Sequence, residues 1–163
     1  MKFLEKDLED IIWESSNEKL EEKGLSVMGV KKRQLRIGNY GIADIVTFER
    51  ISRDGYEQPY LDITVYELKK EKAGISAFLQ AARYCKGISS YLEIHKPKMF
   101  FRLNIVLCAK EIDTSSDYIF LTDLIMSDYF GYINLVSNYS FEYGIDGIIF
   151  KQEKNYNLTA KGF

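Results

Sequence analysis

The chain has 163 residues, a formal net charge of −2 and two cysteines, a size that suits one domain with a substantial core. Apolar residues make up 46% of the chain and charged residues 28%, which excludes wholesale disorder. No apolar run reaches the ~18 residues needed to cross a membrane, and the acidic N-terminus does not match a secretory signal. We therefore expect one soluble, cytoplasmic domain over residues 1–163, with Cys85 and Cys108 reduced.

The charges are unevenly distributed along the chain. Residues 1–30 carry a net charge of −4, residues 31–110 a net charge of +7 and residues 111–163 a net charge of −5. A basic centre in an acidic protein is typical of a surface that meets a polyanion. The alternative is that these cations are scattered over solvated faces.

Apolar periodicity predicts the elements in chain order. Residues 3–23 are expected to form one amphipathic helix that ends at Gly24. Two segments rich in β-branched and aromatic residues, 35–50 and 59–70, predict a strand pair with a turn at residues 53–55. A second helix is expected over residues 73–92, followed by a buried strand at 101–109.

The C-terminal third predicts a short helix at residues 122–130 and strands at 133–141 and 147–153. No repeat or linker divides the chain. The order of helices and strands indicates an α/β or α+β layered fold on one mixed sheet.

Three charged residues on the expected strand pair point to chemistry. Glu67 and Lys69 are two apart, so they project from the same face of a strand. Hairpin pairing can bring Asp44 beside Glu67, and a divalent cation relieves the repulsion between two such carboxylates. Glu and Lys alternate on many exposed strands, but here they follow the apolar run at residues 61–66. These are the parts needed for metal-assisted phosphodiester hydrolysis.

Both predicted helices offer further candidates. On the first helix, Glu5 lies at the edge of the apolar stripe and Glu9 lies farther toward the polar side, so Glu5 is the better third ligand. A solvated acid near the helix N-terminus is the alternative. On the second helix, Gln80 and Tyr84 share one face with Arg83 beside them, and all three can contact phosphate.

Together these motifs resemble the PD-(D/E)XK nuclease superfamily, and the Gln-x-x-x-Tyr element resembles its RecB-like branch. The order is similar to the catalytic domain of archaeal and actinobacterial mismatch endonucleases. Ala43 stands where the superfamily name has proline. The matching residues are Glu5, Asp44, Glu67, Lys69, Gln80 and Tyr84.

The resemblance implies a restriction-endonuclease-like three-layer sandwich, with a mixed central sheet flanked by helices. It implies that Glu5, Asp44 and Glu67 bind Mg²⁺ or Mn²⁺, and that Lys69 orients or activates the attacking water. Gln80 and Tyr84 would position the scissile phosphate, which makes Asp44, Glu67, Lys69, Gln80 and Tyr84 the expected catalytic residues. The expected DNA contacts are Lys31, Lys32, Arg33, Arg36, Lys70, Lys72 and Arg83.

The expected function is metal-dependent DNA endonuclease activity with a metal-activated water, in DNA repair, recombination or defence. DNA is the expected partner, and a homodimer would place one active site on each strand. The mismatch endonucleases have a further DNA-binding domain, so a partner protein that supplies DNA targeting is another arrangement. The alternative function is a non-catalytic module that keeps the fold and binds nucleic acid or protein.

Overall fold

The computed structural model describes residues 2–52, 58–113, 115, 117–121 and 133–154. In this part of the chain α1 spans Glu5–Glu14, α2 Asn17–Glu22 and α3 Ile75–His95, one 3-10 turn (η1) spans Gly38–Tyr40, and residues 117–121 are also helical. Its strands are β1 (Val30–Arg36), β2 (Ile42–Ile51), β3 (Tyr60–Leu68), β4 (Lys72–Ala73), β5 (Phe100–Ala109), β6 (Glu111–Ile112), β7 (Ile133–Gly144) and β8 (Gly147–Glu153).

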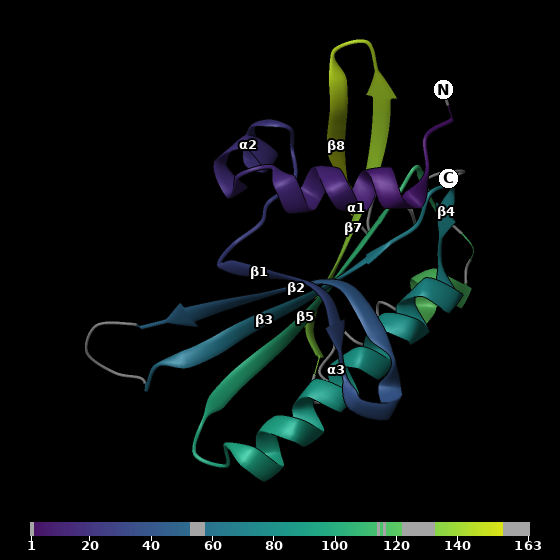
Figure 1. The fold of residues 1–163 in the computed structure, drawn as a ribbon. Coiled ribbons are helices and arrows are strands. Elements are labelled where there is room, and N and C mark those ends of the chain that lie inside the picture. Colours follow the sequence, from purple (N-terminus) through teal and green to yellow (C-terminus); the bar gives the residue numbers. More distant parts are fainter. Residues whose placement is uncertain (1, 53–57, 114, 116, 122–132, 155–163) are drawn as a thin grey trace.

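Six strands form one mixed sheet in the order β1-β2-β3-β5-β7-β8. The central pairs β3–β5 and β5–β7 are parallel, whereas β1–β2, β2–β3 and β7–β8 are antiparallel. The long helix α3 connects the parallel strands β3 and β5 (Figure 1). The short strands β4 and β6 pair separately. The protein is therefore a mixed α/β protein, as the order of predicted elements indicated.

Helices cover both faces of this sheet (Figure 1). Along β3, Ile63 and Val65 belong to the core under α3, while Tyr66 and Leu68 belong to the core under α1 and α2. Side chains alternate between the two faces of a strand, which is why a strand buried on both sides is apolar almost throughout. None of the described helices is long and apolar enough to cross a membrane.

The N-terminal segment forms two helices where one was expected over residues 3–23. The chain leaves the helical conformation at Ser15 and Ser16, and the Ser16 hydroxyl accepts a hydrogen bond from the Lys19 N–H at 3.1 Å. A serine that caps the following turn competes with helix continuation. The prediction of a single helix was therefore wrong, although Gly24 does follow its last turn.

The other predicted elements agree with the structure where they are described. The helix at 73–92 corresponds to α3, and the strands at 101–109, 133–141 and 147–153 correspond to β5, β7 and β8. The segment at 35–50 is split into β1 and β2 by η1, because Gly38 and Gly41 have φ angles of 48° and 118°. The turn predicted at 53–55 and the helix predicted at 122–130 lie outside the described residues.

Candidate active site

The β2–β3 ladder brings Asp44 and Glu67 together. The last paired residues are Ile45 and Tyr66, so the same antiparallel register puts Asp44 opposite Glu67. The Leu68 N–H donates to Asp44 Oδ2 at 3.4 Å. Because β2 begins where β3 ends, both carboxylates lie at one end of the sheet, as the sequence predicted.

Glu67 is buried, with only 2% of its surface exposed. Burial, and after it the neighbouring charge of Asp44, raise the pKa of its carboxyl group to about 7. Its Oε2 atom is buried and has no hydrogen-bond partner among the described residues. Burial also raises the pKa of Asp44, with contributions from Glu9 and Glu5. Acidic side chains that repel one another therefore lie together at this end of the sheet.

Lys69 lies beside this carboxylate pair, as the two-residue spacing predicted. Its Nζ atom is 3.3 Å from Glu67 Oε1. Burial by itself lowers the pKa of Lys69, but Glu67, Glu5 and Asp44 outweigh that effect and leave the pKa raised. Lys69 is thus held in its charged form, and it satisfies only one of the two Glu67 oxygens.

The two candidate metal ligands of α1, Glu5 and Glu9, lie differently from their helical-wheel positions. Glu5 is exposed and accepts the Lys70 N–H at 3.3 Å. Glu9, expected on the polar side, is only 8% exposed. Its carboxylate accepts from Arg33, at 2.7 Å, and from the Gln34 side chain. Glu9, which the helical wheel put farther toward the polar side, is therefore buried, because a strand remote in sequence covers that side of the helix.

Gln34 completes the same arrangement from β1 and was not anticipated from the sequence. It has a φ angle of 50°, in the left-handed region that glutamine rarely adopts. The flanking pairs Arg33–Ile45 and Leu35–Ala43 put Gln34 opposite Asp44. Strained backbone of this kind is concentrated at functional sites. A pocket of about 650 Å³ opens here, lined by Glu5, Lys6, Glu9, Asp10, Arg33, Gln34 and Asp44.

Gln80 and Tyr84 face one another on α3, as predicted. Gln80 Nε2 donates to the Tyr84 hydroxyl at 2.8 Å, and the Tyr84 side chain is largely buried. The Tyr84 ring packs on Gly41, where an added Cβ would lie 3.0 Å from Tyr84 Cε1. This contact ties α3 to the start of β2, three residues before Asp44. Neither side chain hydrogen bonds to Asp44, Glu67 or Lys69.

The seven cations expected to contact DNA lie in three kinds of environment. Lys32 and Arg36 on β1 and Arg83 on α3 are exposed. Lys31 instead donates to the Ile12 and Ser15 carbonyls at the end of α1. The others have acidic partners: Arg33 has Glu9 and Asp10, Lys70 has Glu71 at 3.7 Å, and Lys72 has Asp113 at 4.0 Å. For all seven residues, DNA contact stays a prediction.

No group of three acidic, histidine or cysteine side chains in the described part of the chain is arranged as a ready metal site. Comparison with protein-family models, curated proteins and solved structures finds no significant match. The site consists of two juxtaposed carboxylates, one buried carboxylate oxygen with no donor among the residues that the structure describes, and an adjacent charged lysine.

Proposed function

We propose that the protein is a metal-dependent DNA endonuclease of the PD-(D/E)XK superfamily that acts in DNA repair, recombination or defence. The observation that carries the proposal is the buried carboxylate of Glu67, which lies beside Asp44. Its Oε2 atom has no hydrogen-bond donor among the described residues. Buried polar atoms almost always have a partner. A carboxylate oxygen that lacks one, next to a second carboxylate, suits a hard divalent cation.

The donor set at this end of the sheet fits Mg²⁺ or Mn²⁺. Asp44 and Glu67 would hold the ion, and Glu5 would join them by exchanging its contact with the Lys70 N–H. When bound, the ion supplies positive charge that polarises a phosphate and makes a water molecule more acidic. That charge would also lower the raised pKa of Glu67, so that both acids are ionised together.

Lys69 and Tyr84 have separate roles in the proposed reaction. Because Lys69 is held charged, it donates hydrogen bonds to the attacking water or to the phosphate and does not act as a base. The Tyr84 hydroxyl already accepts from Gln80, which leaves its own proton free to bind a phosphate oxygen. Hydrolysis would then proceed without a covalent intermediate.

The finer features of the resemblance belong to this proposal. They are the restriction-endonuclease-like form of the sandwich, the cytoplasmic location, and a homodimer or a targeting partner that delivers the site to DNA. The observed layers, with helices on both faces of a mixed sheet, are compatible with that form.

The test is cleavage of labelled single-stranded, duplex, flapped and mismatched DNA, with Mg²⁺, with Mn²⁺ or with a chelator. We expect metal-dependent cutting that falls at least about 100-fold in the Glu67→Ala variant, because both the ion and Lys69 lose their partner. The exposed Glu111→Ala variant is the matched control and should cut normally. Full activity in Glu67→Ala would refute the assignment. DNA binding without cutting on any substrate would favour the non-catalytic module.

A further inference from the structure

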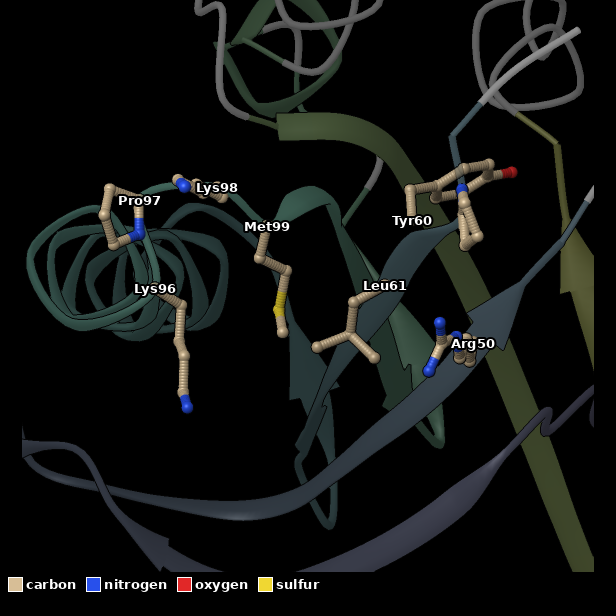
Figure 2. A pocket seen from close by; sticks show the side chains of 8 residues that line it. Arg50, Tyr60, Leu61, Lys96, Pro97, Lys98 and Met99 are labelled. Atoms are coloured by element: carbon tan, nitrogen blue, oxygen red, sulfur yellow. The ribbon is translucent and has the colours of Figure 1, made fainter.

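A second pocket lies at the opposite end of the sheet from the carboxylates. It has a volume of about 620 Å³ and forms where β2 ends, β3 begins and α3 leads into β5 (Figure 2). We call it the distal pocket; it is lined by Arg50, Pro59, Tyr60, Leu61, Lys96, Pro97, Lys98 and Met99. Its volume is in the range of small-molecule sites.

Among the described residues, the charged side chains that line the distal pocket are all cations: Arg50, Lys96 and Lys98. None of the three forms an ion pair or a side-chain hydrogen bond with another described residue. By contrast, Arg102, close by on β5, has an acidic partner: it pairs with Asp62 at 3.4 Å and lies over the Tyr60 ring at 4.6 Å. The three pocket cations are therefore available to a ligand with negative charge.

The floor of the distal pocket is apolar. The side chains of Leu61 and Met99 lie between Lys96 on one side and Arg50 on the other (Figure 2). The two prolines extend this apolar surface. A suitable ligand thus combines a flat apolar body, which packs on Leu61 and Met99, with an anionic group within reach of flexible cations. Guanidinium and ammonium groups both bind phosphate oxygens well.

We propose that the distal pocket binds a nucleotide, with its base on the apolar floor and its phosphate on Lys96, Lys98 and Arg50. This ligand is either a free nucleotide or one nucleotide of a DNA strand. The second source rests on the proposed nuclease function. Tyr60 and Glu67 are seven positions apart on β3, which corresponds to a distance of about 23 Å at ~3.3 Å per residue. A duplex strand covers that span in about seven nucleotides at ~3.4 Å each.

The first test is calorimetric titration of the chelator-treated protein with thymidine 5′-monophosphate, with thymidine and with inorganic phosphate. We expect the monophosphate to bind most tightly, because only it uses both the cations and the floor. The Lys96→Gln/Lys98→Gln double variant should bind it at least about ten-fold more weakly. Lys19→Gln/Lys154→Gln removes the same charge from exposed positions elsewhere and should bind normally.

The floor is tested separately with Met99→Gln, which keeps the side-chain length but adds an amide. It should weaken binding of the monophosphate and leave binding of inorganic phosphate unchanged. Equal binding of thymidine and its monophosphate, or unchanged binding in the Lys96/Lys98 double variant, would overturn the proposal.

A fluorescent single-stranded 12-mer distinguishes the two sources. If the ligand is part of a strand, the 12-mer binds more tightly than the monophosphate, and the double variant lowers its salt slope by about 0.7 per lost contact. If the ligand is a free nucleotide, the double variant affects only the monophosphate. If the double variant changes neither the binding of the monophosphate nor the salt slope of the 12-mer, the proposal is overturned. Cleavage that survives Glu67→Ala would instead refute the nuclease function and leave these binding results untouched.

Discussion

Gln34 stands opposite Asp44 across β1 and β2, at a point where its own backbone has a φ angle of 50°. Its side chain turns to the Glu9 carboxylate of α1. One residue of an edge strand thus connects the first helix to the strand that carries a candidate catalytic acid. Because left-handed backbone is unfavourable for glutamine, the connection has a measurable cost in stability.

Comparison of Gln34→Gly with Gln34→Ala isolates that cost. Both variants lose the bond to Glu9, but only glycine relieves the left-handed conformation. We expect Gln34→Gly to be more stable than Gln34→Ala by about 1 kcal/mol in urea unfolding. At Lys32, an exposed position of ordinary φ on the same strand, the order should reverse. If the alanine variant were the more stable at both positions, residue 34 would be unstrained.

The stability of the folded protein should decrease as the pH rises, because of Glu67. Its pKa is raised from 4.5 to about 7 in the folded protein, so the folded state binds its proton more tightly than the unfolded state. This contribution is complete below pH 4.5, declines between pH 4.5 and 7 and is lost above that window. The shift, in which the opposing effect of Lys69 is already included, corresponds to about 3 kcal/mol as an upper bound.

The measurement is urea unfolding between pH 4 and 8 without metal. Glu67→Gln should remove most of the decline and be the more stable protein at pH 8. Glu111→Gln, at an exposed position, is the control and should follow the wild type. An identical pH dependence in Glu67→Gln and wild type would contradict the raised pKa.

Divalent metal should stabilise the folded protein. A ligand present at 100 times its dissociation constant adds about 2.7 kcal/mol, which raises the Tm of a domain of this size by several degrees. We expect millimolar Mn²⁺ to do so in the wild type and to have little effect in Asp44→Asn/Glu67→Gln. Sodium chloride of equal ionic strength controls for screening. An unchanged wild-type Tm would indicate that the carboxylates do not bind metal.

Tyr84→Phe should separate structure from chemistry on α3. It removes only the hydroxyl that accepts from Gln80 and keeps the ring that packs on Gly41. Stability should change by about 1 kcal/mol, whereas kcat/KM for DNA cleavage should fall at least about ten-fold if the hydroxyl contacts phosphate. Tyr91→Phe, exposed on the same helix, should leave both quantities unchanged. Normal cleavage by Tyr84→Phe would remove Tyr84 from the site.

The main features of this fold were predictable because they depend on local periodicity. The apolar spacing of residues 73–92 and the apolar run at 101–109 correctly predicted α3 and β5. The break at Ser15 and Ser16 was missed because two competing local signals, helical periodicity and a capping serine, differ little in free energy. Alternation along β3 also placed Glu67 and Lys69 on one face, where they contact each other.

Local residue patterns were enough to predict the mixed sheet and the juxtaposition of Asp44, Glu67 and Lys69, because neighbouring strands and two-residue spacing leave few alternatives. The burial of Glu9 on α1, in contrast, depends on long-range packing. Arg33 and Gln34, more than twenty residues away, approach Glu9 and exclude water from it. Long-range packing also assembled the distal pocket from segments separated by some forty residues. Such contacts depend on how whole elements pack, and no local pattern of residues encodes that packing.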